Sequence, residues 1–114
     1  QARVLIMGTT FKENVSDIRN SKIIDTVKEL LAFNIHVDVE DPYAESQEVH
    51  EEYGLKLVRE VKNGYDAVII TVPHKPYLDL DDKYFASITH DHALVADLKG
   101  IFKNKITSRK YWSL

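Results

Sequence analysis

Short apolar runs recur along the chain at intervals that leave room for a helix or a long loop between them. The runs are Val4–Met7, Ile35–Val39, Ala67–Val72 and Ala93–Ala96. Three of them are continuous, which is typical of strands whose two faces are both buried. The run at Ile35–Val39 alternates with polar residues and is rich in β-branched side chains, which also favour strands. The pattern therefore predicts four strands.

A helical pattern fills the segment between the first two strands. Asn20 or Ser21 can cap this helix, and Asn34 suits the left-handed residue that ends it. Its apolar positions recur at helical spacing and are Ile23, Ile24, Val27, Leu30 and Leu31. Further along we expect a helix over Ala44–Tyr53, a short strand over Leu55–Val58, a helical turn over Arg59–Gly64, a helix over Asp81–Ile88 and a polar tail over Lys103–Leu114.

Strands that alternate with helices predict a mostly parallel sheet with helices on both faces. The 114 residues suit one domain, and the sequence contains no internal repeat, low-complexity tract or linker. We therefore expect an α/β fold, a Rossmann-like three-layer sandwich, in which residues 1–114 form a single domain.

Composition narrows the classes of function. Apolar residues make up 44% and charged residues 29%, as in ordinary soluble proteins, and a net charge of −3 disfavours nucleic acid or an anionic membrane as partner. No apolar run approaches the roughly 20 residues that span a bilayer. The absence of cysteine excludes a disulfide, a thiolate metal site and a cysteine nucleophile within this chain. Because the chain starts at Gln1 and enters a core strand almost at once, we expect a segment to precede it.

Ligands of such sheets bind beyond the carboxyl ends of the strands. Here the relevant loops are Gly8–Asn20, Val72–Leu78 and Asp97–Phe102. The first combines two cations with a helix N-terminus just behind it, which suits an anion. It contains neither the GxGxxG nor the GxxxxGK[ST] pattern, so neither of the usual phosphate-binding mechanisms applies. The last loop adds Lys99 and Gly100, a cation next to a residue that permits close backbone approach.

The segment Gly8–Asn20, GTTFKENVSDIRN, resembles the signature that opens the C-terminal, UDP-binding domain of UDP-glucose/GDP-mannose dehydrogenases. The Phe-Lys pair followed seven residues after the Lys by Arg is long and specific. Further similar segments are Val39–Pro42, Tyr65–Ile70 and Val95–Gly100, so the resemblance covers nearly the whole chain. The Phe-Lys-Glu-Asn start and the Asp-x-Lys-Gly loop are most similar to bacterial UDP-N-acetyl amino sugar 6-dehydrogenases.

This resemblance implies a part of a larger enzyme. Such enzymes combine an N-terminal NAD-binding Rossmann domain, a central helical dimerisation region and a C-terminal domain that closes over the UDP-sugar. They oxidise the C6 alcohol of the sugar to a carboxylate in two steps with two NAD, through a nucleophilic cysteine in an upstream segment. We accordingly expect a cytoplasmic, homo-oligomeric enzyme that serves surface polysaccharide biosynthesis. This chain alone, without the cysteine, is expected to be inactive.

The resemblance also assigns site residues. Phe11 and Lys12 match positions that contact the UDP-sugar, and Arg19 matches the position that reaches toward NAD on the other domain. Lys99 falls where many relatives carry an arginine on the UDP, although a one-residue shift would align Gly100 there instead. No catalytic residue and no metal ligand is expected in this chain, and the residues that select the sugar lie largely elsewhere.

Several readings compete with these assignments. His90–His92 could suggest a metal site, but two histidines without a third ligand favour an ordinary loop. His74 follows a strand and could touch a substrate, although packing within the loop is favoured. For the whole chain, the alternatives are a ligand-free Rossmann-like regulatory or protein-interaction module, and the nucleotide domain of another NAD enzyme. The missing glycine fingerprint disfavours the last of these.

Overall fold

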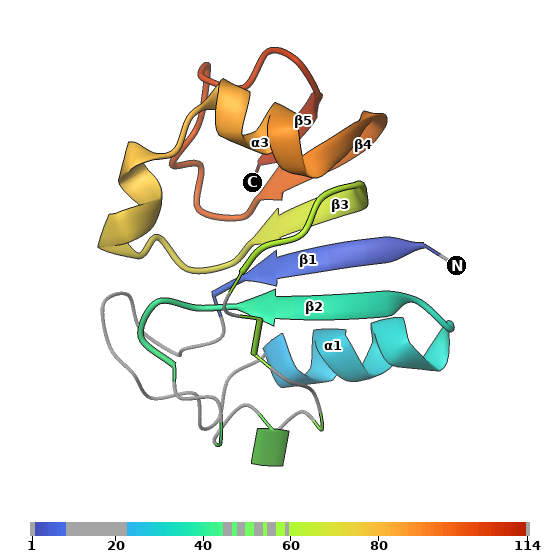
Figure 1. Cartoon of the computed structure of the whole chain (residues 1–114). Coiled ribbons are helices and arrows are strands. Elements are labelled where there is room, and N and C mark those ends of the chain that lie inside the picture. The colour runs from blue at the N-terminus through green and yellow to red at the C-terminus, as the bar shows by residue number, and fades with distance from the viewer. Residues whose placement is uncertain are drawn as a thin grey trace.

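The centre of the molecule is one sheet of five parallel strands (Figure 1). The computed structural model describes residues 2–8, 23–44, 47, 50–51, 54, 57–58 and 60–113, and for residues 23–27 it describes the backbone alone. The strands are β1 (Arg3–Met7), β2 (His36–Glu40), β3 (Tyr65–Ile70), β4 (Thr89–Asp97) and β5 (Lys110–Ser113). They lie in the order β2-β1-β3-β4-β5, and each neighbouring pair is parallel. The predicted α/β class and parallel sheet are confirmed.

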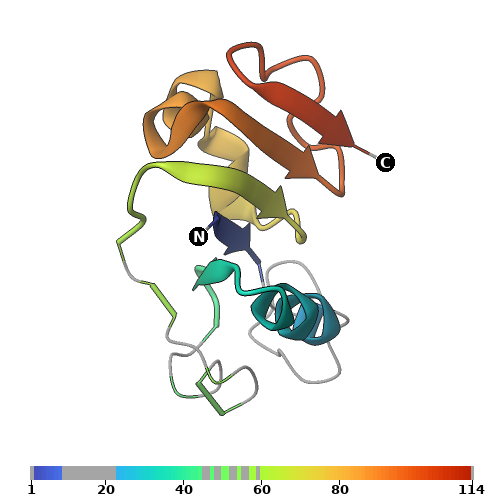
Figure 2. The same ribbon diagram turned by 90° about the vertical axis from the view of Figure 1, so that its right-hand side faces the viewer.

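Helices cover both faces of this sheet. Figure 2 shows α1 (Ile23–Ala32) on one side and α3 (Asp82–Ile88) on the other, with the short 3-10 helix η1 (Lys75–Asp79) preceding α3. The three-layer arrangement is therefore also confirmed. Asn34 has the left-handed φ of 60° expected after α1. Within the described part of the chain, no helix has the length and apolar character needed to cross a membrane.

The apolar core lies in two layers because successive strand residues face opposite sides of the sheet. The layer under α3 is built around Phe85 and Phe102, whose rings meet edge to face at 5.0 Å. It also contains Leu5, Met7, Val68, Ile70 and Val95. The layer under α1 contains Val4, Ile6, Val37 and Val39, with Leu30 packed against it. Since β1 contributes to both layers, its sequence is apolar at every position from Val4 to Met7.

The segment before β3 is not the predicted helical turn. Residues 60–64 have no helical backbone, and Gly64 has a φ of 76° that ends any regular helix. Val61 packs against the core, and Arg3 donates a hydrogen bond from Nη1 to the carbonyl of Asn63 at 2.8 Å. Of the predicted strand over Leu55–Val58 the structure describes residues 57 and 58, and Leu57 forms a parallel bridge with Val39. Most of the predicted helix over Ala44–Tyr53 lies outside the described residues.

The predicted polar tail contains a fifth strand. β5 pairs with β4 along Leu94–Asp97 and lies at the edge of the sheet. Its residues alternate between exposed Lys110 and Trp112 and half-buried Tyr111 and Ser113. This strand was missed because only one of its faces is partly covered, so it lacks the continuous apolar run of the central strands.

The predicted loop at His90–His92 lies inside β4, where it forms a bulge. Tyr65 pairs with Thr89, whereas Ala67 already pairs with Leu94, so the register shifts here and β4 contains more residues than the facing part of β3. The His92 amide donates to Nδ1 of His90, which leaves Nε2 of His90 as the donor to Asp66. Across the described residues, no cluster of three or more His, Asp or Glu is arranged to hold a metal ion.

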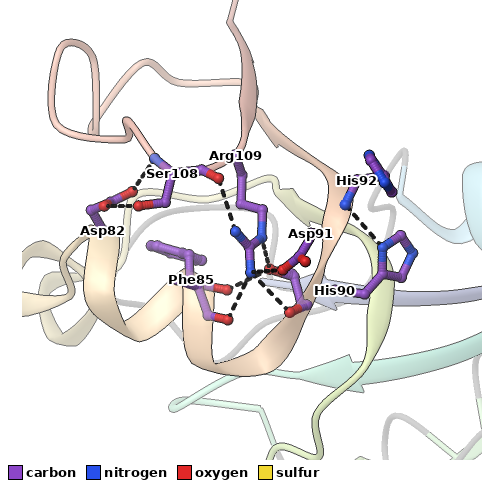
Figure 3. A network of polar contacts seen from close by, with 9 residues as sticks. Asp82, Phe85, His90, Asp91, His92, Ser108 and Arg109 are labelled. Carbon is purple, nitrogen blue, oxygen red and sulfur yellow. Dashed lines mark hydrogen bonds and ion pairs between the residues drawn. The ribbon is translucent and has the colours of Figure 1, made fainter.

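A polar network ties α3 to the segment before β5 (Figure 3). Arg109 donates from its guanidinium to the carbonyls of Ala86 and Thr89, at the C-terminal end of α3. Asp82, at the other end of α3, accepts hydrogen bonds from the amides and hydroxyls of Thr107 and Ser108. These contacts anchor the connection between β4 and β5 on the helix.

The Asp82 contacts predict a pH dependence of stability. Hydrogen bonds from Ser108 and Thr107 lower the pKa of Asp82 from its usual 3.8 to about 2. A folded-state pKa below the unfolded one stabilises the fold above about pH 4, and that contribution disappears as the pH falls to about 2. We expect Asp82→Asn to flatten this part of the stability profile, measured by urea unfolding with the fluorescence of Trp112. Asp79→Asn, which replaces an exposed acid on η1, is the control, and identical profiles for wild type and Asp82→Asn would contradict the prediction.

Candidate functional site

The carboxyl ends of the strands meet at one edge of the sheet, where ligands of parallel sheets bind (Figure 1). Backbone hydrogen bonds continue the ladder just beyond the strands. Gly8 N donates to Glu40 O at 2.8 Å, Thr71 N to Met7 O at 3.0 Å, and Leu98 N to Ile70 O at 3.0 Å. The loops after β1, β3 and β4 therefore start side by side. With two strand spacings between them, the starts of the β1 and β4 loops lie about 10 Å apart.

Gly8 begins the first of these loops, and its conformation requires glycine. Its φ is 103°, and an added Cβ would lie 2.9 Å from Oγ1 of Thr71 and 3.0 Å from Cβ of Val72. Thr71 fixes this approach, since its hydroxyl donates to the carbonyl of Gly8 at 2.5 Å. The predicted site residues Phe11, Lys12 and Arg19 follow on this loop but lie outside the described residues.

Lys99 lies in the turn directly after β4, at the same edge. The amide of Gly100 donates to the carbonyl of Asp97 at 3.2 Å, which closes the turn, and Gly100 has a φ of 68°. The side chain of Lys99 is exposed. Its ammonium group is thus available to an anion at the carboxyl edge, two strands away from Gly8.

Sequence reasoning missed two residues beneath this turn, Asp97 and Tyr111. Asp97 is fully buried, and its Oδ2 accepts hydrogen bonds from the Phe102 amide at 2.7 Å and the Tyr111 hydroxyl at 2.6 Å. Asp97 could have been recognised from the sequence, because an acid at the carboxyl end of a buried strand is a common functional residue. Its contact with Tyr111 could not have been predicted, because β5 itself was not predicted.

A second buried polar group lies at the ends of β2 and β3. Asp41 accepts from the amides of Tyr43 and Ala44 through one oxygen, and its other oxygen lies 2.9 Å from Nε2 of His74. The side chains of Asp41 and His74 are both wholly buried. The ring of His74 packs edge-on against Tyr43 and lies 5.5 Å from the ring of Tyr77. This agrees with the packing role expected for His74.

The acidic residues at the end of β2 show whether this domain could bind NAD as dinucleotide-binding Rossmann domains do. In dinucleotide-binding Rossmann domains an acid at this place binds a ribose hydroxyl. Here Glu40 accepts the Tyr77 hydroxyl at 2.7 Å, and its burial raises the pKa of the carboxyl. Asp41 is engaged by the Tyr43 and Ala44 amides and by His74. Both acids are thus engaged within the chain, which disfavours NAD held in that manner.

The amino edge of the sheet carries a hollow of about 620 Å³, which is lined among others by Arg3, Asn63 and Ile88. These residues lie where β1, β3 and β4 begin. The hollow is thus at the opposite edge from Gly8 and Lys99, and it takes no part in the candidate site.

Comparison of the sequence with protein families identifies residues 5–104 as the UDP binding domain of the UDP-glucose/GDP-mannose dehydrogenase family. A UDP-N-acetyl-D-glucosamine 6-dehydrogenase of Salmonella typhi is 44% identical over 97 residues, which are 84% of this chain and 23% of that protein. A Pseudomonas aeruginosa protein of the same name is 39% identical over 86% of this chain and 24% of its own length. Protein CapL of Staphylococcus aureus is 36% identical over 99% of the chain and 27% of its own length. The chain thus spans about a quarter of the length of these relatives.

Solved structures share the fold over almost the whole chain. The UDP-N-acetyl-mannosamine dehydrogenase Cap5O from Staphylococcus aureus superimposes with a TM-score of 0.78 at 23% identity, covering 99% of this chain and 26% of that one. A UDP-D-ManNAc dehydrogenase from Pyrococcus horikoshii gives 0.77 at 19% identity, covering 99% and 25%. At these identities the likeness concerns the fold alone. The family itself is shown by the sequence match over residues 5–104: this chain belongs to the UDP-glucose/GDP-mannose dehydrogenase family.

Proposed function

We propose that this chain is the UDP-sugar-binding domain of an NAD-dependent nucleotide-sugar 6-dehydrogenase. The enzyme would oxidise the C6 alcohol of the sugar to a carboxylate for surface polysaccharide biosynthesis. The main support is the family match over residues 5–104, in a chain whose Lys99 stands exposed at the ligand-binding edge of the sheet. The substrate class follows the names of the bacterial relatives, two of which are UDP-N-acetyl-D-glucosamine 6-dehydrogenases.

The diphosphate of UDP would lie over the carboxyl edge, between the loops that begin at Gly8 and at Leu98. Lys12 lies four residues beyond Gly8 in the sequence. Four residues of extended chain reach at most about 14 Å, so Lys12 lies within that distance of Gly8. Since the two loop starts lie about 10 Å apart, Lys12 and Lys99 can reach one diphosphate from opposite sides. Phe11 would pack against the same ligand. Lysine supplies a point charge and three donors for phosphate oxygens.

In this proposal NAD is held mainly by another part of the enzyme, and Arg19 reaches toward it. The internal hydrogen bonds of Glu40 and Asp41 support this division, because both acids at the end of β2 already bind groups of this chain. When bound, NAD would serve as the electron acceptor of the reaction. We further propose that residues 1–114 form one domain of a cytoplasmic homo-oligomer.

The alternative from another functional class is a ligand-free regulatory or protein-interaction module with the same fold. A measurement of UDP binding distinguishes the two functions. A module without a ligand site should not bind UDP in a way that depends on Lys99. The nucleotide domain of a different NAD enzyme is disfavoured by the missing glycine fingerprint and by the engaged acids of β2.

The proposal predicts weak, lysine-dependent binding of UDP by this chain. We expect a dissociation constant on the order of 1 mM, equivalent to roughly −4 kcal/mol, since part of the pocket comes from elsewhere in the enzyme. Lys12→Ala should abolish this binding. Lys99→Ala should weaken it roughly tenfold through loss of a charge-assisted hydrogen bond. Titration followed by the phosphorus resonances of UDP measures both.

Lys62→Ala is the matched control, because Lys62 is an exposed lysine at the amino edge of the sheet. It should leave the affinity unchanged. Equal losses of UDP affinity from Lys62→Ala and Lys99→Ala would indicate nonspecific attraction between UDP and surface lysines, and would contradict the proposed site.

The proposal also predicts that the chain alone cannot oxidise UDP-sugars. It has no cysteine to act as the nucleophile, and the part of the enzyme expected to hold NAD is not included. Incubation with NAD and several UDP-N-acetyl amino sugars should produce no NADH absorbance above background. Turnover that co-purifies with the chain would overturn the assignment of the chemistry to other parts of the enzyme.

A further inference from the structure

Asp97 combines full burial with an incomplete set of hydrogen bonds. One carboxylate oxygen, Oδ2, accepts from the Phe102 amide at 2.7 Å and from the Tyr111 hydroxyl at 2.6 Å. The other, Oδ1, is also buried, and no hydrogen bond reaches it from the described residues. A buried acceptor without a partner costs free energy. Stability alone therefore does not explain an aspartate at this position.

The two bonds to Oδ2 determine the shape of the turn that carries Lys99. Leu98 is held by its amide to Ile70, and Gly100 by its amide to the carbonyl of Asp97. Beyond the turn, the Phe102 amide is held by Asp97 itself. The backbone is thus fixed both before and after Lys99, so the ammonium group extends from a fixed point at the carboxyl edge.

Tyr111 supports Asp97 from the neighbouring strand. It lies on β5, which pairs with β4 in parallel, and its ring packs against the core that contains Phe102. Burial and the hydrogen bond to Asp97 raise the pKa of Tyr111 to about 12, so its hydroxyl stays protonated and donates at neutral pH. The Tyr111 hydroxyl therefore links β5 to the acid beneath the turn.

We propose that Asp97 and Tyr111 are positioning residues for UDP-sugar binding, which act by fixing the turn that presents Lys99. The inference rests on the proposed function, because it takes the diphosphate of UDP as the ligand of Lys99. Ordering the turn before binding removes an entropic cost that the ligand would otherwise have to offset. Neither residue touches the ligand in this arrangement, since Asp97 is fully buried and Tyr111 points toward it.

The test is a double-mutant cycle that measures the affinity of the chain for UDP. Tyr111→Phe deletes the hydroxyl and should weaken UDP binding roughly threefold to tenfold. In the Lys99→Ala background the same change should have an effect of less than about twofold, because a positioning residue acts only through the residue that it positions. Asp97→Asn keeps an oxygen that can accept from both the Phe102 amide and Tyr111. Its affinity should stay within about threefold of wild type, whereas Asp97→Ala should weaken binding by up to roughly tenfold, the loss expected from Lys99→Ala itself.

Tyr65→Phe is the matched control. Tyr65 donates its hydroxyl to buried Asp38 in the same kind of Tyr–Asp pair, but at the amino end of β3. Tyr65→Phe should lower the urea concentration at the midpoint of unfolding without changing the affinity for UDP. If Asp97→Ala does not fold, Tyr111→Phe and Asp97→Asn still decide the question.

The outcomes separate the two proposals. Binding that depends on Lys99 but is unchanged by Tyr111→Phe overturns the positioning inference alone. An equal loss from Tyr111→Phe with and without Lys99 also overturns it, since the effect would then be a general loss of structure. If wild-type chain shows no Lys99-dependent affinity for UDP, the proposed function fails and the inference fails with it.

Discussion

The parallel pairing of β1 with β3 is the contact on which the rest of the structure depends. These two strands lie at the point where the strand order reverses, with β2 on one side and β4 on the other. Their apolar residues pack into the core on both faces of the sheet, and Gly8 approaches Thr71 so closely that a Cβ would lie 2.9 Å from its hydroxyl. This contact fixes where the β1 loop leaves the sheet. The ladder then continues to Leu98, so the loop with Lys99 leaves from the same edge.

Buried acids of this chain are used to hold its own strands together. Asp38 accepts the hydroxyl of Tyr65, Asp41 binds His74, and Asp97 accepts the hydroxyl of Tyr111. Each pair links two strands or their loops across the sheet. These three acids are therefore engaged within the fold, whereas the side chain of Lys99 at the carboxyl edge is exposed. This distribution suits a diphosphate better than the ribose of a dinucleotide.

How far the sequence predicted the fold depends on how completely each strand is covered. β1 and β3 were recognised from continuous apolar runs, because residues on both faces enter the core. β5 was not recognised, since Lys110 and Trp112 face solvent and only Tyr111 and Ser113 are partly covered. The bulge at His90–His92 depends on a register shift against β3, which no local pattern encodes.

The sequence predicted only part of the candidate site. Lys99 was named from its place after a buried strand and from the family signature; the structure places it exposed at the carboxyl edge, and its role in binding stays a prediction. The contact of Asp97 with Tyr111 joins residues 14 positions apart through a strand that the sequence did not predict. Phe11, Lys12 and Arg19 remain predictions, because they lie outside the described residues.

In the proposed function, UDP binds at the carboxyl edge, between the loops that follow β1 and β4. Paramagnetic broadening by UDP bound to Mn²⁺ tests this directly, because the effect on each amide resonance reports its distance from the diphosphate. We expect the amides of Gly8 and Gly100 to broaden first, while Asn63 and Gly64 at the amino edge stay sharp. Preferential broadening of Asn63 and Gly64 would place the diphosphate in the hollow at the opposite edge and contradict the account.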